Sequence, residues 1–195
     1  MAEKRPREKG EAEHSFVVEL PPRRDRESVS EKSWKIDLPD GLDFEGQRFA
    51  LPDGLSVKAE ARWLEDSLLA VRLSLETRVT GECARCLGEA SLAISDDLMY
   101  LYFPRGLELG KNTQLASDDG YMPVEADLRG RTLEIGDQVW ETLLTLLPLR
   151  LLCKEDCAGL CQNCGADLNE GPCSCAGGND PRLDALRGVL GDLPE

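Results

Sequence analysis

Residues 152–175, LCKEDCAGLCQNCGADLNEGPCSC, hold six of the eight cysteines of the 195-residue chain. The six form three closely spaced pairs with glycines between them: Cys153 and Cys157, Cys161 and Cys164, Cys173 and Cys175. Short spacings of this kind let neighbouring sulfur atoms converge on one point, while glycine adopts the positive φ that a tight turn needs. The stretch therefore predicts a tetrahedral thiolate metal site that binds Zn²⁺.

A second motif of this kind lies far upstream, where Cys83 and Cys86 enclose two residues between two strand-like runs. The strongest single motif is CQNCG at 161–165, because a two-residue gap followed by glycine directs backbone N–H groups at the sulfurs. Eight thiols can fill two four-sulfur sites, or fill one site and leave four over. The spacing leaves this choice open, so all eight cysteines are candidate ligands for one or two Zn²⁺ ions.

Other uses of the cysteines fit the sequence less well. Disulfides suit secreted chains, but the N-terminal residues, MAEKRPREKGEAEH, are polar throughout and lack the apolar core of a signal peptide. A redox C-x-x-C motif belongs at a strand-to-helix junction, whereas Cys83 and Cys86 lie between two strand-like runs. We therefore expect reduced cysteines in a cytoplasmic protein.

The composition indicates a soluble, acidic protein. No run of residues approaches the roughly 18 apolar positions of a membrane span, and we expect no membrane partner. The net charge of −14 opposes a broad nucleic-acid-binding face, because such a surface repels phosphates. Two local basic clusters are the exceptions, and we interpret both as solvated segments: Lys4, Arg5, Arg7 and Lys9, and then Arg23, Arg24 and Arg26.

Alternating apolar and polar residues predict a β-sheet before the cysteine-rich stretch. The clearest strands have every second residue apolar: Val57 to Trp63, and then Leu69 to Val79. Further strands are predicted near 16–20, 34–38, 92–102, 121–128 and 131–135, with a long loop at 104–120. The CARC motif would form the tip of an antiparallel hairpin in a meander of about five or six strands.

One helix is predicted over 137–147, because its apolar residues recur at helical spacing: Val139, Trp140, Leu143, Leu144 and Leu147. Asp137 can cap its start, and Pro148 ends it. A last helix would open at Asp180, with Pro181 in its first turn.

The predicted fold class is α+β: an antiparallel β-meander sheet or partial barrel covered by a helix, with a C-terminal cysteine-rich zinc-binding module and a terminal helix. The domains would be a disordered tail (1–14), the sheet domain (15–150), and the metal module with its helix (151–195).

No catalytic constellation is present in the sequence. A catalytic zinc keeps one position open and usually takes histidine or carboxylate ligands, but the only histidine is His14, in the polar tail. Phosphate-binding glycine loops and the G-x-S-x-G motif are also absent. We therefore expect a protein that is not an enzyme.

The ordered set of motifs closely resembles the bacterial YceD family, the large ribosomal RNA subunit accumulation proteins. The resemblance runs from about Val17 to Leu190 and rests on these segments: CARCL at 83–87, VWE at 139–141, LLPL at 146–149, CAGLC at 157–161, CG at 164–165, LN at 168–169, CSC at 173–175 and DPRL at 180–183.

The resemblance implies a non-catalytic cytoplasmic factor for large-subunit ribosomal RNA accumulation, with metal and nucleic-acid binding. Its partner would be this RNA, its ribonucleoprotein, or a protein of the assembly machinery. Arg85, between two knuckle cysteines, is the candidate contact, because its planar guanidinium suits a phosphate or carboxylate; a surface pair with Glu82 or Glu89 is the alternative. A zinc-stabilised adaptor for protein interactions, with no RNA role, is the alternative function.

Overall fold

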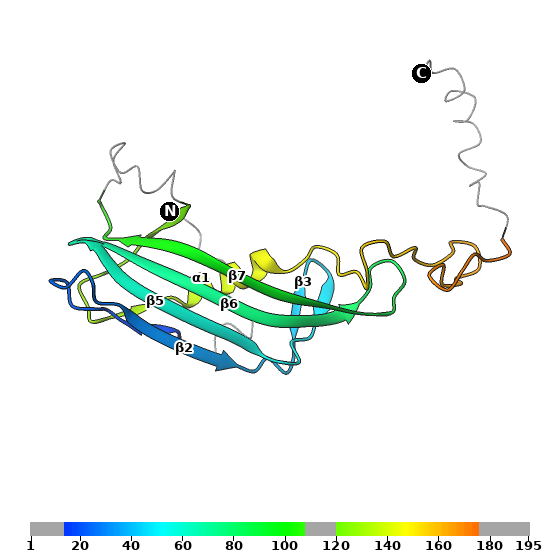
Figure 1. The fold of residues 1–195 in the computed structure, drawn as a ribbon, viewed down its shortest axis with the longest axis horizontal. Coiled ribbons are helices and arrows are strands. Elements are labelled where there is room, and N and C mark those ends of the chain that lie inside the picture. Colours follow the sequence, from blue (N-terminus) through cyan, green and yellow to red (C-terminus); the bar gives the residue numbers. More distant parts are fainter. Residues whose placement is uncertain (1–13, 108–119, 176–195) are drawn as a thin grey trace, which may run out of the picture. The chain divides into compact units, whose positions relative to one another are not determined.

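The structure, a computed structural model, describes residues 14–107 and 120–175 (Figure 1). These residues form two compact units: one contains 14–81, 91–107 and 120–151, and the other contains 82–90 and 152–175. The expected terminal helix from Asp180 and nearly all of the expected N-terminal tail lie outside the described residues. The hairpin tip with Cys83 and Cys86 thus belongs to the same unit as the other six cysteines.

The first unit is built on a five-stranded sheet in the order β2-β5-β6-β7-β8 (Figure 1). Its strands are β2 (Ser30–Ile36), β5 (Leu55–Glu65), β6 (Leu68–Glu82), β7 (Glu89–Phe103) and β8 (Tyr121–Glu125). Strand β5 pairs antiparallel with both β2 and β6. The predicted alternation is confirmed, because every second residue from Val57 to Trp63 and from Leu69 to Val79 is buried on one face.

The prediction of an all-antiparallel meander is wrong at its last strand. Strand β8 runs parallel to β7, in a register that pairs Met99 with Tyr121 and Phe103 with Glu125. A parallel neighbour needs a crossover of about a dozen residues or more, and the connection over 104–120 is long enough to supply one. The strands of the described residues form an open sheet rather than a barrel.

Two small two-stranded sheets accompany the main sheet. Strand β1 (Val17–Glu19) pairs with β9 (Thr132–Glu134), and β3 (Leu42–Phe44) pairs with β4 (Gln47–Phe49). The β3–β4 hairpin was not predicted from the sequence. Its two-residue turn is Glu45-Gly46, where both residues have positive φ (49° and 77°), as the common tight hairpin turn requires. The Glu-Gly pair is a weaker signal than the usual Asn-Gly or Asp-Gly.

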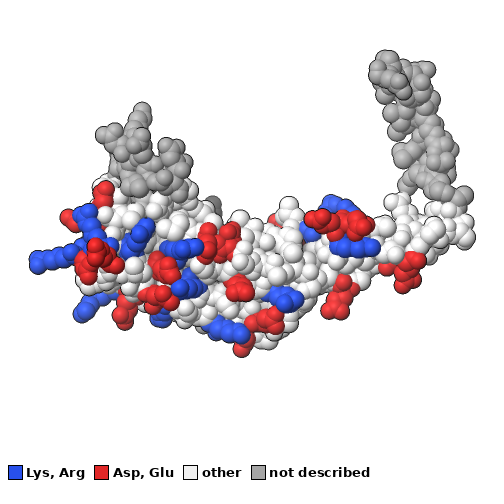
Figure 2. All heavy atoms as spheres, in the orientation of Figure 1, with Lys and Arg blue, Asp and Glu red and all other residues white. Residues whose placement is uncertain are grey.

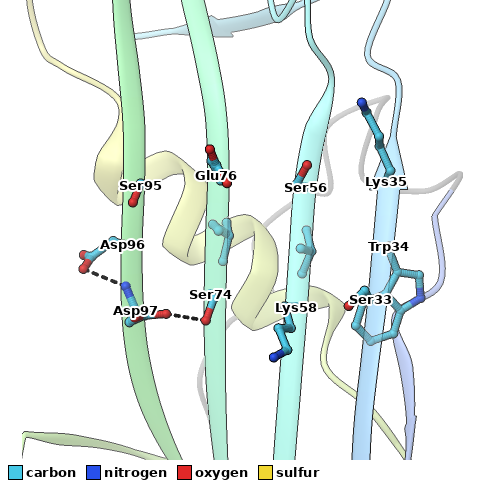
Figure 3. A pocket seen from close by; sticks show the side chains of 12 residues that line it. Ser33, Trp34, Lys35, Ser56, Lys58, Ser74, Glu76, Ser95, Asp96 and Asp97 are labelled. Atoms are coloured by element: carbon cyan, nitrogen blue, oxygen red, sulfur yellow. Dashed lines mark hydrogen bonds between the residues drawn. The ribbon is translucent and has the colours of Figure 1, made fainter.

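Helix α1 (Gly136–Leu146) lies against one face of the main sheet (Figures 1 and 3). Its buried side chains are Val139, Trp140, Thr142 and Leu143. The prediction that Asp137 caps the helix is wrong, because Asp137 lies in the first turn and Ile135 is the N-cap residue. The Glu134 carboxylate instead accepts the N–H of Gly136 at 3.1 Å. At the other end Leu147 is extended (ψ 131°), as expected before Pro148.

Candidate metal centre

The eight cysteines gather into two groups of four, which answers the question that their spacing left open. In each group the four sulfur atoms all lie within 4.8 Å of one another. The groups, here called centre I and centre II, are respectively Cys83, Cys86, Cys153 and Cys157, and Cys161, Cys164, Cys173 and Cys175. All eight thiols are free rather than joined in disulfides.

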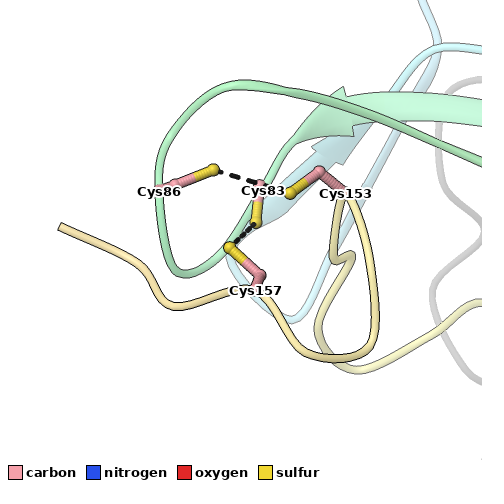
Figure 4. Close-up of side chains that lie close together, drawn as sticks. All are labelled: Cys83, Cys86, Cys153 and Cys157. Carbon is pink, nitrogen blue, oxygen red and sulfur yellow. Dashed lines mark hydrogen bonds between the residues drawn. The ribbon is translucent and has the colours of Figure 1, made fainter. Parts of the chain in front are cut away.

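The sulfur positions of centre I fit a tetrahedral ion. Cys83 Sγ lies 3.7 Å from Cys157 Sγ, and Cys86 Sγ lies 3.7 Å from Cys153 Sγ (Figure 4). A Zn–S bond of about 2.3 Å gives a tetrahedron whose sulfur–sulfur edge is about 3.8 Å. A disulfide would instead bring two sulfurs to about 2.05 Å. The donor set and its spacing therefore suit a four-coordinate thiolate site.

Each centre begins with the same backbone turn, the knuckle. In centre I, the N–H of Leu87 donates to the carbonyl of Cys83 (2.9 Å), and the N–H of Cys83 donates to the carbonyl of Gly88 (2.7 Å). In centre II, the N–H groups of Gly165 and Cys161 make the matching bonds, both at 2.8 Å, to Cys161 and Ala166. The fifth residue of each knuckle has positive φ, 59° at Leu87 and 73° at Gly165.

In each knuckle, the thiol of the first cysteine has a lowered pKa. Backbone N–H groups, chiefly that of Cys86, lower the pKa of Cys83 to about 6. The N–H groups of Cys164 and Asn163 likewise lower the pKa of Cys161 to about 6. In contrast, Cys153 has its pKa raised to about 12, because its thiol proton is held by the sulfur of Cys157. A cation would remove the remaining protons, because the ligand form of cysteine is the thiolate.

Centre I has polar support around its ligands. The side-chain amide of Asn169 donates to Cys157 Sγ (3.4 Å) and accepts the N–H of Ala158 (2.9 Å). Gly159, with φ 74°, lies so close that a Cβ atom there would meet the Arg85 carbonyl oxygen at 3.1 Å. The hairpin tip and the 152–169 segment are thus tied together by backbone as well as by sulfur.

Arg85 joins the same two segments. Its Nη1 donates to the backbone carbonyls of Cys157 (2.9 Å) and Glu155 (3.3 Å). One nitrogen of the fork of this candidate contact residue is therefore already bonded, to the loop that carries Cys153 and Cys157. Asn169 was not singled out from the sequence, although it stands in the LN segment of the family resemblance.

The cysteine-rich unit has almost no apolar core. Its buried residues with apolar or thiol side chains, within the described range, are Cys83, Ala90 and Cys157. The large buried side chains, among them Trp63, Tyr100 and Phe16, all belong to the sheet unit. Burial of apolar side chains therefore gives the cysteine-rich unit little stability, and its eight cysteines are gathered in the two four-thiol groups.

The sheet unit carries a shallow hollow of about 800 Å³ on the open face of its strands, with α1 behind them (Figure 3). The hollow is lined mainly by serines and charged side chains. Lys58 is paired there with Glu60 (2.7 Å) and Glu31 (3.3 Å), and Asp97 is paired with Arg72 (2.7 Å). Paired charges on an open antiparallel face are the ordinary solvated surface.

The three arginines interpreted as a solvated segment, Arg23, Arg24 and Arg26, are all exposed, but two of them also make contacts within the protein. Arg23 lies over the Trp63 ring (4.1 Å) and donates to two backbone carbonyls, and Arg26 pairs with Asp66 at 3.5 Å. On the face shown in Figure 2, Lys and Arg side chains are interspersed with Asp and Glu. This view offers no continuous basic stripe for a nucleic acid.

The fold and the cysteine groups define a sheet protein with a separate cysteine-rich unit that carries two four-thiol centres. The chain belongs to the family of the large ribosomal RNA subunit accumulation protein YceD, whose family model matches residues 71–190. This match confirms the family resemblance over the range that holds all of its quoted segments, but not over residues 17–70. No curated protein and no solved structure gives a significant match. Among the described residues, no helix is long and apolar enough to cross a membrane.

Proposed function

We propose that this chain is a non-catalytic, cytoplasmic factor that promotes accumulation of the large-subunit ribosomal RNA. Family membership supports the role, since the family takes its description from that process. The four-thiol centres support the absence of catalysis, because four protein ligands leave no open position on a tetrahedral ion.

Both centres bind Zn²⁺ in this proposal. The observation that carries it is the pairing of two four-thiol groups with a unit that buries almost no apolar side chains. Tetrahedral thiolate sites take zinc or iron, and zinc is the usual ion of structural sites without redox function. Structural zinc contributes on the order of 10 kcal/mol of apparent binding energy to folding.

The direct partner in this proposal is a ribonucleoprotein or an assembly protein, because the net charge of −14 opposes binding to bare RNA. Arg85 is the proposed contact at the hairpin tip, acting through the donors of its fork other than Nη1. The second candidate, a zinc-stabilised adaptor with no RNA role, is favoured by the mixed charges of the face in Figure 2.

Sedimentation tests the proposal. In cells of the source organism, the factor should travel with precursor large subunits in a gradient, and its deletion should lower large-subunit ribosomal RNA. Presence only in the light fractions, with normal ribosomal RNA after deletion, would support the adaptor instead.

Arg85→Ala removes the Nη1 bonds but leaves the backbone bond from Leu160 N–H to the carbonyl of residue 85 (3.3 Å) and all eight thiols, so it should keep both metal ions. It should nevertheless fail to restore the RNA, whereas Arg24→Ala from the basic loop should restore it. Full restoration by Arg85→Ala would show that Arg85 is not the contact, and metal analysis of the purified variant separates lost contact from lost zinc.

A further inference from the structure

Leu87 is an exposed apolar side chain held in an unfavourable backbone conformation. It is 62% exposed and has φ 59°, in the left-handed region that non-glycine residues rarely adopt. An exposed leucine gains little from burial, and the positive φ adds strain. The position is therefore unfavourable for the free protein on both counts, and such outliers point to a role outside the fold's own stability.

The second knuckle supplies an internal comparison. Gly165 stands at the position equivalent to Leu87, with the same hydrogen bond to the first cysteine and φ 73°. Glycine adopts this conformation without a clash of its side chain. The turn thus has no need of leucine, since the same chain builds it with glycine at centre II.

The charges around Leu87 indicate the kind of surface that it would meet. The described part of the cysteine-rich unit carries six acidic and two basic side chains, and the acidic ones include Glu82 and Glu89 on either side of the tip. The described part is therefore acidic overall even with Arg85 counted as a full positive charge, since its hydrogen bonds go to neutral backbone carbonyls. Each zinc-filled centre would add about −2, because four thiolates outweigh one dication.

We propose that Leu87 is the apolar anchor of an interaction surface for a cationic protein, whose apolar cleft receives the leucine while its basic rim faces the acidic tip. The inference rests on the proposed function and deepens it by naming the partner's chemistry. A leucine inserted into such a cleft regains the burial that it lacks in the free chain. An RNA partner would oppose the same acidic surface.

The Leu87→Gly variant of the full zinc-loaded chain tests this anchor, with Leu149→Gly as the matched control, since Leu149 is 74% exposed. The probes are the purified proteins of the large ribosomal subunit freed of RNA, and the RNA of the same subunits freed of protein. We expect the wild type to bind the protein fraction in a salt-sensitive manner. Leu87→Gly should lose at least about tenfold in affinity, as removal of an anchor does, and Leu149→Gly should not.

Thermal unfolding and metal content provide the second readout. Leu87→Gly should melt no earlier than the wild type and keep both zinc ions, so that binding falls without any loss of stability. Earlier melting would overturn the inference, because it would mean that Leu87 packs within the chain, for example against residues 176–195. A change from dimer to monomer would make a second copy the occupant. The inference would also be overturned if the wild type bound only the RNA probe or neither probe. Equal binding of the protein fraction by the wild type and Leu87→Gly would overturn it as well.

The test of the Leu87 anchor and the test of the proposed function can fail independently of each other. If the wild type fails to restore large-subunit ribosomal RNA in cells that lack the factor, the proposed function fails whatever Leu87 does. If the wild type restores the RNA and Leu87→Gly does so equally, only the anchor is wrong.

Discussion

Asn169 shows how one side chain fixes both the position and the charge of a ligand. Its amide nitrogen donates to Cys157 Sγ, and this bond is the main reason that the pKa of the Cys157 thiol is lowered. Its amide oxygen holds the next peptide group, at Ala158. The thiolate of a buried ligand is thus stabilised and aimed by a residue that does not itself bind metal.

We predict that Asn169→Ala weakens zinc binding at centre I by about 10–100-fold, the usual cost of losing a partner of a metal ligand. Competition with a chromophoric chelator would measure this loss. Asn163→Ala is the matched control, because Asn163 is exposed on the second knuckle and supplies its backbone N–H rather than its side chain. Equal affinities for the two variants would rule out the Asn169 bond as a determinant.

At the scale of elements, hydrogen bonds fix the helix on the sheet in addition to apolar packing. The Tyr100 hydroxyl from β7 meets Thr142 Oγ1 from α1 at 2.8 Å, and both side chains are buried. Next along the same strand, Tyr102 donates to Gln138 Oε1 at 2.9 Å. These two tyrosines set where α1 sits along β7, which apolar contacts alone specify poorly.

Thr142→Val should therefore lower the free energy of unfolding of the sheet unit by about 1–3 kcal/mol, because it leaves the buried Tyr100 hydroxyl without its partner. Urea denaturation followed by tryptophan fluorescence would measure the change. Thr145→Val is the control: it is the same substitution on the same helix, but Thr145 is exposed and bonds only to the Glu141 carbonyl. A similar loss in both variants would mean that helix propensity, not the tyrosine contact, is responsible.

At the scale of the whole molecule, the two units are stabilised by different means. The sheet unit buries large side chains such as Trp63 and Tyr102, whereas the cysteine-rich unit has eight thiols and few buried apolar groups. Hydrophobic burial does not depend on a metal ion, but a thiolate cluster without its cation has strong mutual repulsion.

Zinc removal should thus open one unit and spare the other. With a strong chelator, we expect amides of residues 82–90 and 152–175 to exchange rapidly, while the centres of β5 and β6 stay protected. Hydrogen exchange with mass spectrometry would follow both sets of amides, and added zinc should restore protection. Simultaneous opening of the whole chain would show that the units are not independent.

The sequence alone determined the local features of this protein. Period-two alternation predicted β5 and β6, helical spacing predicted α1, and the C-x-x-C spacing predicted both knuckles, because each depends on residues only a few positions apart. The β3–β4 hairpin was missed because Glu45-Gly46 is a weak turn signal. The parallel direction of β8 was missed because a long connection is compatible with either strand direction.

Only the tertiary structure decided how the cysteines combine. Cys86 and Cys153 are 67 residues apart in sequence, yet their sulfurs lie 3.7 Å apart in centre I. The spacing alone is equally compatible with a four-thiol centre whose ligands all come from the six cysteines between Cys153 and Cys175. The long hairpin of β6 and β7 places Cys83 and Cys86 at a tip beside the 152–157 segment, and that distant contact, which no local pattern encodes, divides eight thiols into two sets of four.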